Sequence, residues 1–536
     1  RDYKMLGYDF RATASWNHVF NDIHITNFFA GTEINSTDRS KNYYQGWGMQ
    51  YSMGEIPYYV YEFFKKGIED GNNYYSLSQT RSRSAAFFAN ATYSYKGRYT
   101  VNGTARYEGT NRMGKSRSAR WLPTWNVSGA WNAHEEKFFS NLTSVLSHFT
   151  LKASYSLTAD RGPADVTNSQ AIITSYSPYR PFTSIQESGL YIKELENSEL
   201  TYEKKHELNI GADMGFLNNR INLAVDWYKR NNYDLIGIVN TQGAGGQILK
   251  YANIASMKSH GIEFTLSTKN IKTKDFNWNT DFIFSNAKNE VTDLKQNANV
   301  MELISGNGFA KQGYPVRGLF SIPFVGLDKD GIPVIINEKG EATSTDINFQ
   351  ERQNTGFLKY EGPTDPTITG SLGNMFSYKG FRLNLFITYS FGNVIRLNPV
   401  FKAYYSDLTA MTREFKNRWT LPGDEAKTNV PAILSKRMYD SNEDLKYAYN
   451  AYNYSTERIA KGDFIRLKEI SLAYDFPKAW INPLKLTDLS LKVQATNLFL
   501  IYADDKLNGQ DPEFFNAGGV ASPVPRQFTI TLRLGL

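Results

Sequence analysis

Apolar and polar residues alternate with period two along much of this chain, and the alternating segments come in pairs joined by short connections. In the clearest pair, 85–95 and 99–107, the connection is three residues long. Phe87 and Ala89 share one face of the first segment, and Asn90 lies on the other. Because strand side chains point alternately to the two faces, each segment predicts a strand with one apolar and one polar side.

The same alternation returns further along the chain, and it predicts which residues meet lipid and which line a hydrated lumen. The residues predicted to face lipid are Phe87, Ala89, Val101, Ala105, Leu223, Val225, Leu383, Leu491 and Ile530. Those predicted to face the lumen are Asn90, Thr104, Asn222, Asp226, Lys492 and Thr531. A soluble β-sandwich would show the same alternation with its apolar faces inside, and it stays as an alternative.

The pattern predicts fifteen antiparallel strands in which short and long connections alternate. The predicted strands are 3–16, 22–33, 85–95, 99–108, 123–132, 147–158, 202–216, 221–232, 259–268, 276–289, 368–378, 381–391, 464–475, 488–501 and 525–536. Short turns at one rim, long loops at the other, and Tyr and Trp at strand ends are typical of a transmembrane β-barrel. The alternation slips inside 464–475, which predicts a β-bulge. The long connection 290–367 leaves room for a small hairpin around Tyr314–Leu327.

Composition agrees with a barrel and excludes several other classes. No apolar run among the 536 residues approaches the ~20 residues that a transmembrane helix needs, and the mean hydropathy is −0.48. Aromatic residues make up 15% of the chain. The chain has no Cys, so neither disulfides nor thiolate metal sites are available. The net charge of +7 is small for this length, and no basic tract indicates nucleic acid.

The residues that could carry chemistry form no catalytic or metal-binding motif. The six His have no metal-ligand spacing, and Ser, His and carboxylates form no nucleophilic triad pattern. We therefore expect no enzyme activity, no metal and no cofactor. Aromatic residues in the long connections are the best candidates for ligand contact, since rings stack on sugars and peptide side chains. They are Trp47, Tyr51, Tyr58, Tyr59 and Trp419. The alternative for these rings is packing between loops or against a partner.

Several motifs in the C-terminal third resemble those of SusC/RagA-type TonB-dependent transporters of Bacteroidota. The matching stretches are Gly462–Pro477, Ala495–Phe499, Asp511–Glu513 and Pro525–Thr529. The signature residues within them, expected to be structural, are Phe464, Arg466, Leu467, Asn497, Leu498, Phe499, Asp511, Pro512 and Glu513. Upstream, Glu203–Arg220 and His260–Glu263 also resemble the family, in the same order along the chain.

The resemblance implies an all-β fold and an outer-membrane location in a Gram-negative bacterium. It implies import of oligosaccharides or oligopeptides together with a SusD/RagB-like lipoprotein lid, driven by TonB–ExbB–ExbD through a plug. It leaves open a dimer of transporter–lipoprotein pairs. The family barrel has roughly 22 strands, so residues 1–536 are expected to be its C-terminal part. The signal peptide, the regulatory-like domain, the plug and the first strands would then lie outside this chain.

The resemblance also predicts that two strands of this chain do not pair with each other. Strand 3–16 should not pair with strand 525–536, because strands outside this chain would stand between them.

The alternative function is a passive porin-like or structural barrel without TonB coupling. Outer-membrane lipid is an expected partner, and nucleic acid is not.

Overall fold

The computed structural model divides into two compact units that are described separately below. The residues that it describes are 2–46, 49–57, 60–70, 72, 75–162, 171–176, 188–240, 249–405, 412–515 and 525–535. Unit 1 comprises residues 1–131, 153–208 and 231–255, and unit 2 comprises residues 132–152, 209–230 and 256–536.

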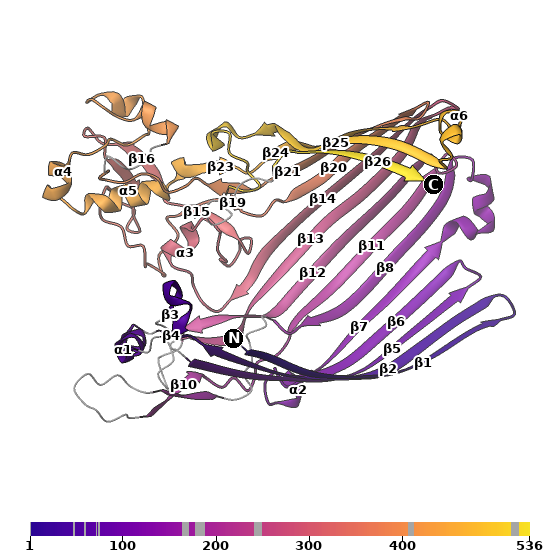
Figure 1. Ribbon diagram of the computed structural model, residues 1–536, viewed down its shortest axis with the longest axis horizontal. Coiled ribbons are helices and arrows are strands. Elements are labelled where there is room, and N and C mark those ends of the chain that lie inside the picture. Colours follow the sequence, from indigo (N-terminus) through magenta and orange to yellow (C-terminus); the bar gives the residue numbers. More distant parts are fainter. Residues whose placement is uncertain are drawn as a thin grey trace. The chain divides into compact units, whose positions relative to one another are not determined.

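Fifteen strands form one antiparallel sheet, which confirms the predicted all-β class and the predicted number of strands. In order of hydrogen-bonded neighbours, they are β1 (Asp2–Phe20), β2 (His24–Tyr44), β5 (Tyr75–Tyr95), β6 (Tyr99–Thr110), β7 (Trp121–Asn132), β8 (Leu146–Asp160), β11 (Glu203–Phe216), β12 (Ile221–Asn240), β13 (Leu249–Lys272), β14 (Phe276–Leu294), β20 (Ile368–Tyr378), β21 (Phe381–Phe391), β24 (Phe464–Asp475), β25 (Asp488–Ala503) and β26 (Gln527–Gly535). The order begins with β1 and ends with β26. Consecutive strands of the sheet are neighbours throughout, as expected for hairpins (Figure 1).

The strands of unit 1 are longer than the apolar pattern predicts. The β2–β5 ladder continues to the pair Tyr44 and Tyr75, so much of the predicted long connection 34–84 is a paired hairpin. Beyond Ile34 neither face of these strands stays apolar, and the alternation that marks a membrane strand ends there. Backbone pairing continues because it satisfies N–H and C=O groups whatever the side chains are.

Register confirms which side chains of unit 1 share a face. Ala89 pairs with Ala30 and Ala105, whereas Asn90 pairs with Phe29 and Thr104. We call the first side the apolar face and the second the polar face. Phe87, Val101 and Val127 on the apolar face are 56%, 54% and 54% exposed in the isolated chain, as expected for side chains that meet lipid.

Unit 2 shows the same division of faces, together with the predicted bulge. Leu491 pairs with Leu532, and Lys492 pairs with Thr531. In the β21–β24 ladder the register shifts between Phe386 and Ile387, which pair with Glu469 and Leu467. One residue of β24 is therefore left without a partner, which confirms the bulge inferred from the slip in alternation.

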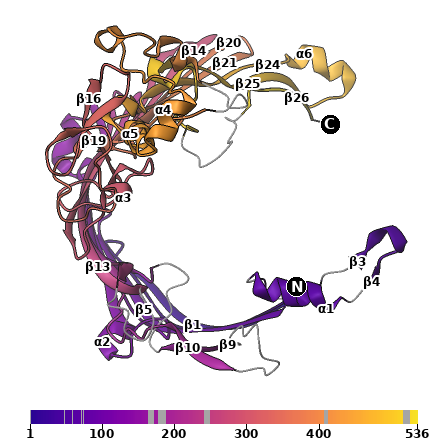
Figure 2. The same ribbon diagram turned by 90° about the vertical axis from the view of Figure 1, so that its left-hand side faces the viewer.

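The long connections of unit 2 fold together into a loop domain, here residues 295–367 and 392–463. Its elements are α3 (Val300–Ile304), β15 (Gly318–Ser321), β16 (Phe324–Leu327), β17 (Pro333–Ile336), β18 (Ala342–Thr343), β19 (Lys359–Pro363), β22 (Val394–Arg396), α4 (Lys436–Ser441), α5 (Leu445–Asn453) and β23 (Ile459–Lys461). Figure 1 and Figure 2 both show α5 near β16, and the rings of Phe324 on β16 and Tyr452 on α5 lie 5.4 Å apart. Two clusters of buried side chains, centred on Tyr449 and on Ile322, form its core.

The connection 290–367 does contain a small hairpin, formed by β16 and β17, but its predicted position around Tyr314–Leu327 is wrong. β15 pairs with β19, and β16 pairs with β17, so the two strands inside the predicted segment do not pair with each other. The partner of β15 begins at Lys359, and a contact at that separation leaves no local sequence signal.

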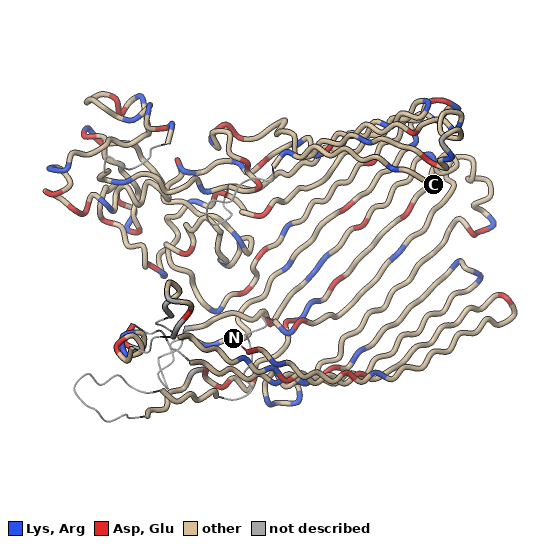
Figure 3. The backbone as a smooth tube through the Cα atoms, viewed as in Figure 1, with Lys and Arg blue, Asp and Glu red and all other residues tan. Residues whose placement is uncertain are grey.

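The remaining short elements lie in the other connections. They are β3 (Met49–Gln50), β4 (Ile56–Pro57), α1 (Tyr61–Glu69), α2 (Arg117–Arg120), β9 (Ile172–Tyr176), β10 (Gly189–Glu194) and α6 (Lys478–Ile481). None of the helices within the described residues has both the length and the apolar composition needed to cross a membrane. In β1, β2, β5 and β6 of unit 1, the Lys, Arg, Asp and Glu residues lie from the middle of each strand to the end away from the short turns (Figure 3).

Candidate functional site

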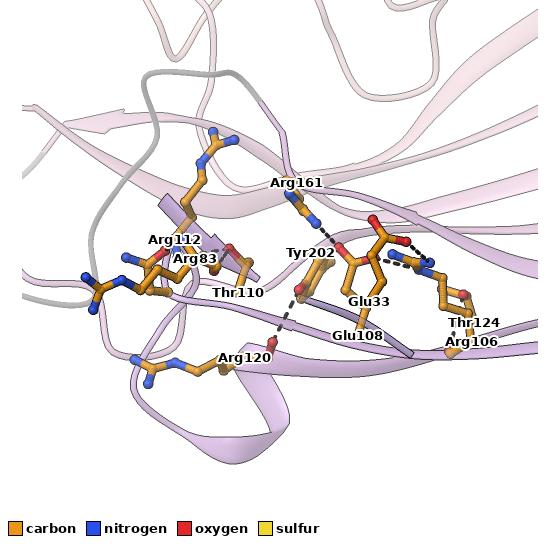
Figure 4. A network of polar contacts seen from close by, with 11 residues as sticks. Glu33, Arg83, Arg106, Glu108, Thr110, Arg112, Arg120, Thr124, Arg161 and Tyr202 are labelled. Atoms are coloured by element: carbon orange, nitrogen blue, oxygen red, sulfur yellow. Dashed lines mark hydrogen bonds and ion pairs between the residues drawn. The ribbon is translucent and has the colours of Figure 1, made fainter. Parts of the chain in front are cut away.

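Four charged side chains gather on the polar face of unit 1 (Figure 4). The Arg106 Nε lies 2.7 Å from the Glu108 carboxylate, and its Nη1 lies 3.4 Å from that of Glu33. Arg161 donates to the other oxygen of Glu108. Glu108 is thus shared by two guanidinium groups. We refer to Glu33, Arg106, Glu108 and Arg161 as the charge cluster.

Water reaches most of the charge cluster. The side chains of Arg161, Arg106 and Glu33 are 33%, 34% and 37% exposed, and that of Glu108 is 18% exposed. Solvent screening at this exposure keeps the contribution of such pairs to stability small. The cluster is therefore better suited to hold a polar ligand or a partner surface than to stabilise the fold.

An aromatic ring on the polar face lies between two arginines beside the cluster. Phe88 pairs with Gly31 on β2, and the guanidinium carbons of Arg11 and Arg106 lie 5.3 Å and 5.8 Å from its ring centroid. A Cβ atom on Gly31 would come within 2.6 Å of the ring and of the Ala12 carbonyl oxygen, so only glycine fits there. Cations above a ring face are attracted to its quadrupole.

Backbone contacts hold the neighbouring connections in place. The Tyr202 hydroxyl donates to the Arg120 carbonyl oxygen at 3.3 Å, and the Thr110 hydroxyl donates to that of Arg83 at 3.0 Å. Burial raises the pKa of Tyr202, and the nearby Arg161 and Arg106 oppose this effect. Tyr202 is therefore a neutral hydrogen-bond donor that fixes the chain next to the charge cluster.

In unit 2 the structure brings two of the signature motifs together. Arg466 on β24 contacts both carboxylate oxygens of Asp511, at 2.6 Å and 2.7 Å, and lies 3.3 Å from the Glu513 carboxylate. The Arg466 and Asp511 side chains are only 7% and 9% exposed. Asp511 also accepts from the backbone N–H of Glu513 at 3.1 Å. The pair therefore attaches the connection after β25 to the strand beside it.

The signature motif Ala495–Phe499 forms an irregularity in β25. Asn497 has a left-handed φ of 53°, and the β24–β25 register shifts between Leu467 and Glu469. Among non-glycine residues Asn is enriched at positive φ, which explains its use at this position. Phe499 resumes pairing, opposite Leu467. Lys468, the unpaired residue of β24, lies opposite Asn497 and Leu498, so the irregularities of the two strands are at the same level.

Two cavities of unit 2 are lined by signature residues. One of about 770 Å³ is lined by Arg466, Asn497, Leu498, Phe499 and Asp511 among others. The other, of about 660 Å³, is lined by Phe464, Pro512 and Glu513, with polar side chains of β20, β21 and the loop domain. Both are large enough for a small organic ligand.

The aromatic residues predicted to contact ligand occupy different settings. Trp47, Tyr58 and Tyr59 lie outside the described residues. Tyr51 is 76% exposed. Trp419 packs against the Tyr449 cluster of the loop domain, and its Nε1 donates to Glu425 at 2.9 Å. The roles of these residues stay a prediction.

Sequence analysis did not single out the charge cluster. Alternation alone is enough to place Glu33, Arg106 and Glu108 on the polar face of their strands, because each lies an odd number of residues away from the positions that form the apolar face. Arg161 follows β8 at the start of a long connection, where no pattern fixes the direction of a side chain. Its contact with Glu108 comes from the tertiary structure alone.

Comparison with known proteins identifies the family. The family model described as TonB dependent receptor-like, beta-barrel matches residues 2–498. The chain belongs to this family. The match confirms the fold suggested by the signature motifs.

Two relatives that are named as TonB-dependent receptors match most of this chain. TonB-dependent receptor P39 of Formosa agariphila is 26% identical over 583 residues, covering 97% of this chain and 52% of the relative. TonB-dependent receptor SusC of Bacteroides thetaiotaomicron is 26% identical over 515 residues, covering 88% of this chain and 47% of SusC. The chain thus spans about half the length of the relatives that it matches.

Solved structures of a peptide transporter share the fold. A chain of the RagAB peptide transporter matches 99% of this chain with a TM-score of 0.78 and 21% sequence identity, over 56% of its own length. The RagAB peptide importer in its open-open state gives a TM-score of 0.77 at 22% identity, over 100% of this chain and 55% of its own.

Proposed function

We propose that this chain is the C-terminal part of an outer-membrane transporter that imports oligosaccharides or oligopeptides with energy from TonB. The observation that carries the proposal is the family match over residues 2–498, on a sheet with one apolar and one polar face. Strands that precede this chain in the whole protein would complete the barrel between β26 and β1. Transport would proceed by binding, lid closure and plug displacement, without covalent chemistry.

The polar face supports a ligand with several polar groups. The charge cluster offers hydrogen-bond donors and acceptors of both signs, and Phe88 adds an apolar surface between two arginines. Oligopeptides present charged termini and backbone amides, and oligosaccharides present hydroxyls and apolar ring faces. Both classes match this chemistry.

A lipoprotein of the SusD/RagB type is the proposed partner of the loop domain. Large apolar side chains on the described surface of this domain are exposed, among them Leu421 at 68%, Tyr404 at 44% and Tyr447 at 39%. Exposed apolar groups on a folded domain favour a protein interface. The SusC and RagAB relatives are consistent with such a partner.

The test is uptake by cells that carry the full-length transporter. We expect accumulation of a labelled oligosaccharide or oligopeptide that is lost when the transporter, TonB or the lipoprotein gene is deleted. Uptake that persists without TonB, or liposome swelling by the purified protein with small sugars, would instead support the passive porin.

The connection 45–74 can be tested for ligand and lid contact without disturbing the strands. Because Tyr44 and Tyr75 are direct partners with ring centroids 4.9 Å apart, a two-residue Asn-Gly turn can replace residues 45–74. We expect this variant to assemble in the outer membrane and to lose lipoprotein association or uptake. Tyr51→Ala in the intact connection separates the effect of that ring. If association and uptake both persist in the turn variant, the connection serves only for packing.

A further inference from the structure

The apolar face of unit 1 carries a band of uncharged side chains bounded by aromatic rings at both ends. At the turn end the rings of His24 and Tyr95 lie 5.3 Å apart, and at the other end those of Tyr107 and Trp121 stack at 5.0 Å. On β5 the band runs from Tyr95 to Ala85, about 33 Å at about 3.3 Å per residue. Because barrel strands are tilted, this length along the strand corresponds to a height of ~25 Å across the membrane. That is the height of the apolar band of transmembrane β-barrels.

Arginines follow directly beyond this band. Arg83 is the next residue of β5 on the apolar face after Ala85, and Arg81 follows on the same face. Arg120 immediately precedes Trp121 of the outer aromatic pair. In Figure 4 the guanidinium groups of Arg83 and Arg120 point away from the charge cluster. Arg83 on β5 and Arg120 at the end of α2 therefore lie next to the outer end of the band, at the level where lipid headgroups would meet it.

These cations are short of negative partners within the described part of the chain. Arg81 lies 4.0 Å from Asp38, and no ion pair there involves Arg83 or Arg120. The Arg120 Nε is buried without a hydrogen-bond partner among the described residues. The backbone at Arg83 is fixed, because its N–H donates to the Asn111 side chain at 2.8 Å and its carbonyl accepts from the Asn111 N–H at 3.1 Å. Arg83 and Arg120 thus carry charges without an ion-pair partner among the described residues, and the backbone that carries Arg83 is held in place.

A shallow cavity continues this basic edge across β5, β2 and β1. It has a volume of about 180 Å³, and its lining includes Lys4, Leu6, Asp38 and Arg81. Leu6 pairs with Asp38, and Asp38 pairs with Arg81, so these side chains lie on the apolar face. The cavity thus has three cations, Lys4, Arg39 and Arg81, and one anion around an apolar side chain, just beyond the band.

We propose that Arg81, Arg83, Arg120 and Lys4 bind phosphate groups of glycolipids in the outer leaflet, whose acyl chains cover the band. Guanidinium groups bind phosphate oxygens in forked pairs, which suits this cluster. The cations are continuous with the band, and a ligand with both a phosphate and acyl chains matches both surfaces. The inference rests on the proposed outer-membrane location and does not depend on what the protein transports.

The experiment uses the full-length transporter in neutral lipid nanodiscs. Binding of a phosphorylated outer-membrane glycolipid is measured for the wild type, for Arg81→Gln/Arg83→Gln and for the control Lys96→Gln/Arg98→Gln, which removes two charges at the turn end of the same hairpin. We expect the first variant to bind about 25-fold more weakly, at about fivefold for each charge near a membrane surface, and the control to bind as the wild type does. Circular dichroism and lipoprotein association confirm that both variants are folded.

Two further ligands distinguish the sources of phosphate. The dephosphorylated glycolipid should bind to the wild type at least as weakly as the phosphorylated one binds to the arginine variant, because that variant keeps Lys4 and Arg120. Inorganic phosphate should not compete. Equal binding of all three proteins, equal binding of the dephosphorylated lipid, or full competition by inorganic phosphate would each overturn the proposal. Uptake tests the proposed function separately, because lipid binding can fail while import persists.

Discussion

Arg466 on β24 and Asp511, in the connection after β25, form an almost completely buried ion pair in which one guanidinium nitrogen contacts both carboxylate oxygens. Residues between them in sequence are held by the same region: the Asp504 side chain accepts from the Lys461 N–H at 2.7 Å, and Leu507 is buried beside Ile395. The pair thus closes a connection that is tied to unit 2 at several points.

Breaking this pair should release the connection. Asp511→Asn removes the buried carboxylate partner of Arg466 and leaves only the half-exposed Glu513 carboxylate at 3.3 Å. Breaking a buried ion pair in this way costs about 3–5 kcal/mol. We expect faster hydrogen exchange and faster proteolysis at residues 504–515 in the full-length protein. The matched control is Lys339→Gln, which breaks the exposed pair of Lys339 and Asp346, with side chains 55% and 56% exposed. Equal exchange in the wild type and Asp511→Asn would contradict the assignment.

Charge should be tolerated on only one face of β7. Val127 lies on the apolar face near the middle of the band, and Ser128 pairs with Asn102 on the polar face. Val127→Arg should destabilise the barrel by about 2–4 kcal/mol when it meets lipid at mid-depth. Ser128→Arg is the control and should change stability little. Equilibrium unfolding in detergent or lipid measures both, and a smaller effect at Val127 would argue against lipid contact.

The loop domain should depend on one buried amide. Asn453 accepts from the Phe401 N–H at 3.0 Å and donates to its carbonyl oxygen at 2.8 Å, and it is 4% exposed. Asn453→Ala leaves both buried backbone groups without partners, at a cost of about 2–5 kcal/mol. We expect protease cleavage within the loop domain while the strands stay protected. Asn442→Ala, at an exposed position that accepts one backbone bond, is the control.

A turn of the loop domain should loosen in acid. Hydrogen bonds from the Leu421 N–H and from the hydroxyl and N–H of Thr420 lower the pKa of Asp424 to about 2. A carboxyl whose pKa is lower in the folded state stabilises above its unfolded pKa near 4 and loses that contribution as the pH falls toward 2. Hydrogen exchange at residues 420–428, corrected for intrinsic rates, should therefore rise between pH 4 and pH 2. In Asp424→Asn this pH dependence should disappear, and its persistence would assign it to another group.

Period-two alternation was sufficient to predict the strands of the sheet. Successive side chains of a strand take opposite faces, so the pattern along one segment already assigns Ala89 and Asn90 to different sides. The slip in alternation after Leu467 likewise revealed the bulge, because an inserted residue changes the parity of all that follow. The face that a side chain takes and the position of a bulge depend only on neighbouring residues, so the sequence by itself determines them.

Contacts between distant segments were decided only by the tertiary structure. The pairing of β15 with β19, the contact of Arg466 with Asp511 and the contact of Arg161 with Glu108 each join residues that lie far apart in the sequence. The motif residues Arg466 and Asp511 were recognised as a signature, but no spacing rule indicated that they touch. Side chains in long connections have no periodicity to orient them, so their partners follow from the folded path of the chain.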